Sequence, residues 1–260
     1  MRPIWTGSIG FGLVNIPVKI YSAIESSSLD LDMLDKKDHA NIKFKRVNEH
    51  TGKEVPYENI VKGYLYEGQY IILEDQDFEN ANAKKTKVIE VNNFVNKDEI
   101  DTIYFENPYY LAPDKSGERA YFLLKEALLQ SKKVGLGTFV MRNKENLAVI
   151  IPTQKILLLQ RIHFPEEIRN PQDLNVPEKI EVKKPELKIA LSLIDQLTSP
   201  FDISQYHDTY TAELMKVIEQ KARGIKPKTQ KLKVVHQKSQ DLMEQLKASL
   251  NQNQKRKKVS

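Results

Sequence analysis

Short runs of apolar residues, separated by turn-forming residues, follow one another through the first 164 positions of this 260-residue chain. Runs of this kind, rich in β-branched and aromatic side chains, predict strands, and many short strands in succession predict a closed or nearly closed sheet. The expected strands are residues 11–22, 42–47, 63–73, 87–95, 103–111, 136–142, 147–151 and 155–163. Residues 143–146 have the composition of a four-residue hairpin loop. The pattern predicts a mainly β domain, of the α+β class once its helices are counted.

One helical pattern interrupts the strands. Its apolar residues recur at the spacing of one helix face and are Ala120, Leu123, Leu124, Ala127 and Leu128. The pattern predicts a helix over residues 116–131, with Ser116 as its N-cap and Lys132, Lys133 and Gly135 at its end. We expect the apolar face of this helix to pack into the core.

Two further amphipathic helices are predicted in the C-terminal part. The first is defined by Leu187, Ala190, Leu191, Ile194 and Leu197, and the second, which ends at Gly224, by Tyr210, Leu214, Val217 and Ile218. Two isolated helices cannot bury a core, so we expect residues 186–224 to pack on the β domain or on a second subunit. Residues 165–185 contain four of the twelve prolines, which predicts an extended connector between the two regions.

The first 23 residues hold the only Trp and three of the ten Gly, with no charge between Arg2 and Lys19. They predict a buried barrel strand in which glycines permit a bulge or a corner. A secretory signal is disfavoured because the stretch contains too many polar residues and glycines for an apolar core. A dinucleotide-binding loop is disfavoured because the glycine spacing is reversed and no helix follows.

Charge is divided unevenly along the chain. The whole sequence carries +5, whereas residues 225–260 carry ten Lys and Arg against Asp241 and Glu244, a net +8, which leaves residues 1–224 at −3. A body without net positive charge can hold nucleic acid only through cations gathered on one surface. The tail needs no such arrangement. We expect its last ten residues to be a disordered basic end, with Lys255, Arg256, Lys257 and Lys258 as DNA contacts.

The tail also contains apolar residues at helical spacing. Val235, Leu242, Met243, Leu246 and Leu250 fall on one helical face. A stripe of this kind is suited to docking in a groove of a partner protein, and folding back onto the body of the same chain is the alternative.

Composition and motifs disfavour most catalytic functions. The chain has 40% hydrophobic residues, no apolar stretch of 18 residues and no cysteine, which predicts one or two soluble domains without disulfides or thiolate chemistry. The five His residues are scattered, so no metal site is expected. Glu74, Asp75 and Asp77 could hold Mg²⁺ for a nuclease, but acids at a helix start are better explained as caps. The pair His207 and Asp208 could be taken for a metal or catalytic pair, but adjacent residues on a helix do not converge, and packing at a helix start explains them better.

The N-terminal run Ile4-Trp-Thr-Gly-Ser-Ile-Gly-Phe-Gly-Leu-Val-Asn-Ile-Pro-Val18 resembles the opening block of bacterial Ku, the DNA-end-binding protein of non-homologous end joining. Six further blocks, in order along the chain, are similar to the family's pattern. They are residues 55–64, 103–115, 120–128, 193–202, 206–210 and 241–250. Many family members carry two cysteines near residues 46–52, where this chain has none, which argues against a zinc knuckle there.

The resemblance implies a Ku-type β-barrel core over residues 1–164, with an extended arm near residues 42–62. It also implies a homodimer whose arms close over a duplex to form a ring that slides onto double-stranded DNA ends. A leg of roughly ten extended residues reaches about 33 Å, which makes this geometry reasonable. The implied partner of residues 225–260 is a multifunctional end-joining DNA ligase. The resemblance implies a cytoplasmic protein associated with the bacterial nucleoid. It implies no enzymatic activity, no cofactor, and no membrane or small-molecule partner.

Seven cations are the expected DNA-binding residues of the body. They are Lys43, Lys45, Arg46, Lys53, Lys62, Arg142 and Lys144. Alternation on a strand would place Lys43 and Lys45 on one face, where two ammonium groups can meet successive phosphates. Phosphate contacts carry no sequence information, which suits a protein that must accept any broken end. The alternatives are a nucleoid-type architectural protein that holds DNA through its tail, and a nuclease that uses the acids at residues 74–77.

Overall fold

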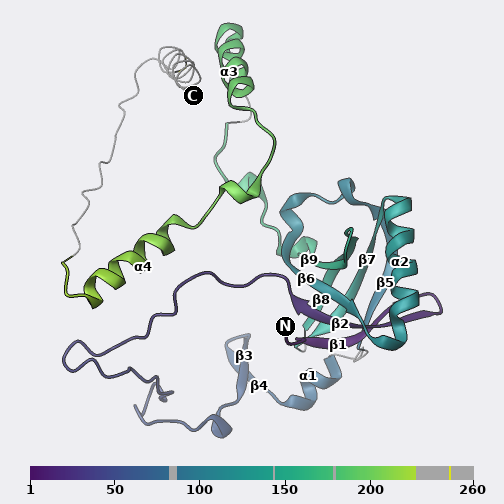
Figure 1. The fold of residues 1–260 in the computed structure, drawn as a ribbon. Coiled ribbons are helices and arrows are strands. Elements are labelled where there is room, and N and C mark those ends of the chain that lie inside the picture. The colour runs from purple at the N-terminus through teal and green to yellow at the C-terminus, as the bar shows by residue number, and fades with distance from the viewer. Residues whose placement is uncertain (82–86, 143, 178–179, 227–245, 247–260) are drawn as a thin grey trace. The chain divides into compact units, whose positions relative to one another are not determined.

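The computed structural model describes residues 1–81, 87–142, 144–177, 180–226 and 246. Its β core is a closed barrel in the order β1-β2-β6-β9-β8-β7-β5 (Figure 1). The barrel strands are β1 (Trp5–Phe11), β2 (Val14–Ser22), β5 (Val88–Asn96), β6 (Phe105–Pro113), β7 (Lys133–Met141), β8 (Lys144–Pro152) and β9 (Leu157–Ile162). Neighbouring strands are antiparallel except β1 and β5, which are parallel. The mainly β class with added helices is confirmed.

The first strands form a hairpin. The strand expected over residues 11–22 is present as β2, which begins at Val14, and the strand before it, β1, was not predicted. Phe11 pairs with Val14, and two residues make the turn between β1 and β2. Gly12 in this turn has φ +55°, a conformation that glycine adopts without a Cβ clash. Ile9, on β1, and Ile16, on β2, are completely buried. The turn was not predicted because both strands supply apolar side chains to the same core, so the sequence has no charged residue between them.

Strands β7 and β8 are buried on both faces. Ala148 and Ile150 face a core that contains the β1, β2 and β6 side chains, while Val149 packs with Val134 and Ile162 in a second cluster. Gly137 allows β7 to approach β5 closely, since a Cβ there would lie 2.1 Å from the backbone oxygen of Glu90. Burial on both faces explains why these strands read as continuous apolar runs rather than alternating ones.

The turn between β7 and β8 is tighter than expected. Met141 pairs with Lys144, so two residues connect the strands and the predicted four-residue loop is wrong. Arg142, the first residue of the turn, has φ +54°. Two-residue hairpin turns require positive φ because their backbone twist must match that of the strands.

The predicted helix is present as α2 (Glu118–Ser131), but its ends differ from the prediction. Gly117 is the N-cap, because residues 115–117 form a 3₁₀ turn in which Asp114 accepts a hydrogen bond from the backbone N–H of Lys115. Lys132, in the left-handed conformation, is the C-cap, and Gly135 lies within β7. The expected N-cap Ser116 and the expected role of Gly135 are therefore wrong.

The apolar face of α2 packs on the barrel, as predicted, through Tyr121, Leu124 and Leu128. The Tyr121 hydroxyl donates to the backbone oxygen of Leu111 at 2.6 Å and accepts from the backbone N–H of Leu157 at 2.7 Å. Burial raises the pKa of Tyr121. Leu123 is 71% exposed, so this member of the predicted stripe lies outside the core.

Residues 30–81 contain less regular structure than predicted. The strand expected over residues 42–47 is wrong, because within this stretch only Val47 forms a β-bridge, an isolated one with Glu54. A short exposed segment without a neighbouring strand has no ladder to join. The strand expected over 63–73 is a hairpin of β3 (Lys62–Tyr66) and β4 (Gln69–Leu73), followed by helix α1 (Asp75–Ala81).

Two helices follow the barrel, as predicted: α3 (Lys184–Leu197) and α4 (Thr209–Ala222). Pro185 belongs to the first turn of α3, where its missing N–H costs nothing. The 3₁₀ helices are Tyr57–Asn59, Lys97–Glu99, Thr102–Tyr104, Lys115–Gly117, Pro165–Glu167, Pro171–Asp173 and Ile203–Gln205.

The chain divides into two compact units, one of residues 1–26 and 30–170, the other of residues 27–29 and those from 171 onward. In the described part of the chain, no helix has the length and apolar content to cross a membrane.

Candidate nucleic-acid interface

The cations expected on the arm surround a closed turn. The side-chain oxygen of Asn48 accepts hydrogen bonds from the backbone N–H groups of His50 and Thr51, both at 3.0 Å. The backbone N–H of Asn48 donates to the oxygen of Lys53, and that of Val55 donates to the oxygen of Arg46. Side-chain capping of this kind lets Asn form a turn without neighbouring strands. The turn thus gathers the cations of residues 43–53 on one local structure.

Two of these cations have partners within the arm. Lys45 Nζ lies 2.6 Å from Glu54 Oε2, and the Arg46 guanidinium lies over the Tyr57 ring at 5.3 Å from its centroid. Lys43 and Lys53 are exposed. An exposed ion pair contributes only about 0–1 kcal/mol, so a phosphate can replace Glu54 as the partner of Lys45 at little cost. The arrangement leaves all four cations available to a nucleic acid backbone.

Lys62 begins β3 and lies beside α1. Its Nζ is 4.5 Å from the centroid of the Phe78 ring, a cation–π contact that joins the hairpin to the helix that follows it. Because this contact uses the ring face, the other side of the ammonium group remains open to solvent or to a phosphate.

Arg142 and Lys144 lie in and next to the tight turn between β7 and β8, and both are exposed. Lys144 Nζ is 3.1 Å from Glu167 Oε1. The hydrogen bond from the backbone N–H of Phe164, together with that from Lys144, lowers the pKa of Glu167 to about 2. Glu167 therefore stays ionised at neutral pH, and Lys144 has a carboxylate partner that sequence reasoning did not predict.

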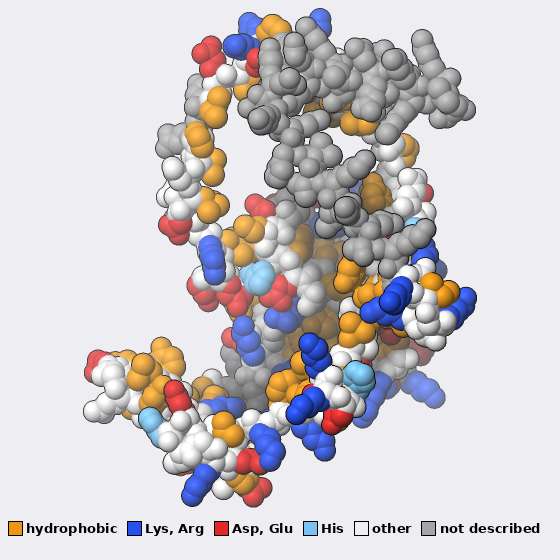
Figure 2. Space-filling model, turned by 90° about the vertical axis from the view of Figure 1, so that its left-hand side faces the viewer, with side chains coloured by type: hydrophobic (Ala, Val, Ile, Leu, Met, Phe, Trp, Pro, Cys, Tyr) orange, Lys and Arg blue, Asp and Glu red, His pale blue; other side chains and the backbone are white. Residues whose placement is uncertain are grey.

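Figure 2 shows blue Lys and Arg side chains dispersed among red, white and orange ones on the face that it draws. This agrees with the slightly negative sum of residues 1–224. The seven predicted cations form one group on the arm turn, a single residue on β3 and a pair at the barrel turn. Contact between these cations and DNA remains a prediction.

The predicted tail contacts Lys255, Arg256, Lys257 and Lys258 lie outside the described residues, as do Val235, Leu242, Met243 and Leu250 of the predicted partner stripe. Leu246 alone of the stripe is described, and it is helical and half-buried.

Two of the acids considered for catalysis hydrogen-bond at the starts of helices. Asp77 Oδ2 accepts a hydrogen bond from the backbone N–H of Glu74 at 2.8 Å, at the start of α1. Asp208 is the N-cap of α4, where hydrogen bonds from the Thr211 side chain and then from its backbone N–H lower the pKa of Asp208. The Asp77 contact agrees with the capping interpretation of residues 74–77, and Asp208 lies at a helix start, as expected, with a capping role that was not predicted.

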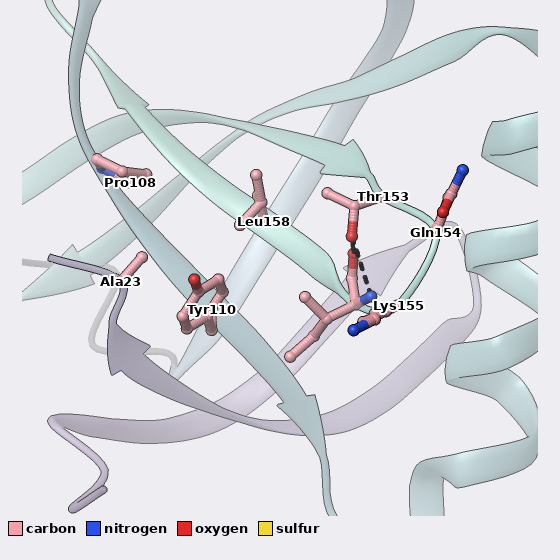
Figure 3. A pocket seen from close by; sticks show the side chains of 8 residues that line it. Ala23, Pro108, Tyr110, Thr153, Gln154, Lys155 and Leu158 are labelled. Carbon is pink, nitrogen blue, oxygen red and sulfur yellow. Dashed lines mark hydrogen bonds between the residues drawn. The ribbon is translucent and has the colours of Figure 1, made fainter. Parts of the chain in front are cut away.

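A shallow hollow of about 600 Å³ lies on the barrel beside β6 and β9 (Figure 3). Its lining residues are Ala23, Pro108, Tyr110, Thr153, Gln154, Lys155, Ile156 and Leu158. The Thr153 hydroxyl donates to the backbone oxygen of Ile156 at 2.6 Å and accepts from its N–H at 3.0 Å, which fixes the turn. Among these described residues, Lys155 is the sole ionisable group besides the Tyr110 phenol, so the hollow offers no acid–base pair.

Two features were missed by sequence reasoning. The first is a polar cluster in which His163 Nδ1 lies 3.0 Å from Glu106 Oε1 and 3.3 Å from Glu167 Oε2, with Arg161 paired to Glu106. The second is the apolar character of both faces of the β3–β4 hairpin. Only the second could have been predicted from the sequence, because the apolar and aromatic residues of 64–66 and 70–73 do not alternate with polar ones. The polar cluster could not, because Glu106 is far from the other three residues in the sequence.

Residues 10–189 match the family described as the Ku70/Ku80 beta-barrel domain. The chain is 37% identical to the "Non-homologous end joining protein Ku" of Coxiella burnetii, covering 99% of this chain and 97% of that protein. Proteins of the same name from Opitutus terrae and Archaeoglobus fulgidus are 38% and 40% identical, covering 97% and 86% of this chain and 92% and 89% of those proteins. The chain belongs to the Ku family.

A solved structure, the SPOC domain of human PHD-finger protein 3, aligns with 62% of this chain and 95% of that one, with 14% identity and a TM-score of 0.32.

Proposed function

We propose that this chain binds the ends of double-stranded DNA as a homodimeric ring and takes part in double-strand break repair by non-homologous end joining, without enzymatic activity of its own. The proposal rests on membership of the Ku family and on the names of relatives that match this chain over nearly its full length. The expected DNA contacts are the arm and barrel cations named above, acting on phosphates alone.

The observation that carries the homodimer is the β3–β4 hairpin. Leu65, Tyr70 and Ile72 share one face of the hairpin, and Tyr64 and Ile71 share the other. All five side chains are exposed in the single chain, by 48–72%. An isolated two-stranded hairpin is marginal in water, and exposed apolar patches mark interaction surfaces. A second copy of the chain, which must have the same unpaired hairpin, is the partner that a symmetric dimer would supply.

The distribution of charge supports binding without sequence preference. The arm cations are on an exposed turn, and Lys45 and Lys144 have exposed carboxylate partners that a phosphate can replace. Contacts of this kind position a protein on a duplex without reading bases. Threading of the duplex through a closed ring then explains selection of ends, because only an end can enter.

The decisive experiment compares retention of a linear duplex with that of the same duplex closed into a covalent circle, with and without Mg²⁺. Salt-stable retention of the linear form alone is expected. Equal retention of both forms would favour an architectural protein, and Mg²⁺-dependent cleavage abolished by Asp75→Ala with Asp77→Ala would favour a nuclease.

Recruitment of an end-joining ligase is assigned in this proposal to the apolar stripe of residues 235–250. Leu242→Asp with Leu246→Asp is expected to abolish stimulation of the ligase while leaving end binding nearly intact. Replacing Gln252 and Gln254 with Asp adds the same charge beyond the stripe and is the matched control. Full stimulation by the Leu variant, or by a chain ending at Gly224, would place recruitment on the barrel.

A further inference from the structure

Three side chains converge where the chain leaves the barrel. Glu106 lies on β6, His163 follows the last residue of β9, and Glu167 ends the 3₁₀ helix Pro165–Glu167. His163 Nδ1 lies 3.0 Å from Glu106 Oε1 and 3.3 Å from Glu167 Oε2. One ligand atom from each of the three residues lies within 4.8 Å of those from the other two. β6 and β9 are neighbouring strands, which is why residues so far apart in the sequence meet.

The two carboxylates are oriented by cations that hold their other oxygens. Arg161 Nη2 is 2.9 Å from Glu106 Oε2, and Lys144 Nζ is 3.1 Å from Glu167 Oε1. Each carboxylate therefore presents to His163 the oxygen that its cation does not hold. Glu167 Oε2 also accepts a hydrogen bond from the backbone N–H of Phe164 at 3.0 Å. An ionised carboxylate oxygen has about two lone pairs, so one remains for another partner.

The geometry suits a metal ion. Zn²⁺ binds imidazole nitrogen and carboxylate oxygen at about 2.0–2.2 Å, so two of its ligand atoms lie at most about 4.4 Å apart. The two separations from His163 Nδ1 already fall within this limit. The 4.8 Å within which one ligand atom of each residue lies is close to it. Hydrogen-bonded carboxylates of fixed orientation are the usual surroundings of a protein-bound metal.

We propose that Glu106, His163 and Glu167 form a site for a divalent transition-metal ion of the Zn²⁺ type, with one coordination position left to solvent. One imidazole and two carboxylates favour such an ion over Mg²⁺ or Ca²⁺, which prefer oxygen ligands alone. The ion would join β6 to residues 163–167 and so stabilise the segment that leads out of the barrel. The proposal does not rest on DNA binding, although the two share one residue, since Lys144 is both an expected DNA contact and the partner of Glu167.

Without a metal, the cluster is a network in which His163 Nδ1 hydrogen-bonds to Glu167 Oε2 and also lies against Glu106 Oε1. The two states differ in a measurable way, because Nδ1 must lose its proton to bind a metal.

The test uses the full chain, stripped of metal with a chelator and titrated with Zn²⁺ by calorimetry, and with Co²⁺ as a visible-absorption probe. One saturable site per chain is expected, with affinity reduced about tenfold or more in His163→Ala and in Glu106→Gln. Glu106→Gln keeps the size of the side chain and an oxygen for Arg161, so it tests ligation in a chain that folds. Zn²⁺ should raise the unfolding midpoint of the unmodified chain and not that of the variants.

Matched controls are His50→Ala, on the exposed arm turn, Glu166→Gln, next to a proposed ligand, and His236→Ala, in the basic tail. These three should bind Zn²⁺ as the unmodified chain does. Unchanged affinity in His163→Ala, loss of binding in His236→Ala, or absence of saturable binding to the unmodified chain would overturn the proposal and leave a hydrogen-bonded cluster only.

Discussion

The indole Nε1 of Trp5 donates a hydrogen bond of 3.0 Å to the backbone oxygen of Val140, 135 residues further along the chain. Trp5 is on β1 and Val140 on β7, and β5 lies between these strands in the barrel. The Trp5 ring also meets the Phe139 ring edge to face, with centroids 6.2 Å apart. The only Trp of the chain thus links β1 to β7 across the intervening strand β5.

Trp5→Phe is expected to lower the free energy of unfolding by about 1–3 kcal/mol, because it removes the indole donor and leaves the Val140 oxygen without that partner. Urea unfolding followed by circular dichroism measures the change, since Trp fluorescence is lost with the residue. Leu13→Ala, at a fully exposed turn position, is the control and should change stability little. Equal effects of the two substitutions would show that the hydrogen bond contributes nothing.

Reversing the charge of Lys43, Lys45 and Arg46 together is expected to weaken binding to linear duplex. The slope of log affinity against log salt should become shallower by about 0.9 for each phosphate that the variant no longer neutralises. Binding is measured over a salt series by fluorescence anisotropy, and light scattering checks that the oligomeric state is unchanged.

The matched variant in the opposite direction is Glu54→Gln, which removes the counter-charge of Lys45 without shortening the side chain. It should strengthen DNA binding. If neither variant alters affinity or salt slope, the arm turn faces solvent and the DNA-facing cations lie elsewhere.

Charges on the β3–β4 hairpin are expected to dissociate the dimer. Leu65→Asp with Ile72→Asp modifies one face, and Tyr64→Asp with Ile71→Asp modifies the other. Burying a carboxylate in an apolar interface costs several kcal/mol, so at least one pair should shift the chain to monomers in light scattering. Leu13→Asp, on the exposed β1–β2 turn, is the control. Dimers that persist in both paired variants would place the interface on another surface.

The depressed pKa of Glu167 predicts a dependence of stability on pH. The pKa lies at about 2 in the folded chain, against an ordinary value of 4.5. A carboxyl whose pKa is lower in the folded state stabilises the protein fully above its unfolded pKa, and this contribution is lost as the pH falls through the folded pKa. Glu167→Gln should therefore be less stable than the unmodified chain above about pH 4.5, with the difference closing towards pH 2.

Urea unfolding at a series of pH values, in the presence of a metal chelator, measures this difference. Glu166→Gln, which leaves the contacts of Glu167 in place, is the control for a Glu-to-Gln change in this segment. A stability difference for Glu167→Gln that stayed constant from pH 5 to pH 2 would show that the hydrogen bonds removed by the substitution, rather than ionisation, are its cause.

The helices were the most predictable elements. The spacing of Leu187 to Leu197 and of Tyr210 to Ile218 was sufficient for α3 and α4, because an amphipathic pattern with period 3.6 has few other interpretations. Helix ends were less predictable. Ser116 is a good N-cap residue by type, but a 3₁₀ turn begun by Asp114 moves the start of α2 to Glu118. Hydrogen bonds of a few neighbouring residues decide such boundaries.

The sequence by itself determined the mainly β class, the helices, the separate basic tail and the likeness to Ku, because these depend on local pattern, charge and residue order. Only the tertiary structure decided that residues 5–22 are a hairpin, that residues 42–47 form no strand, and that Lys45 and Lys144 have acidic partners. It also brought Glu106, His163 and Glu167 together across β6 and β9. The propensity of a segment for helix or strand depends on neighbouring residues, whereas strand pairing and side-chain clusters depend on which distant segments the closed barrel places side by side.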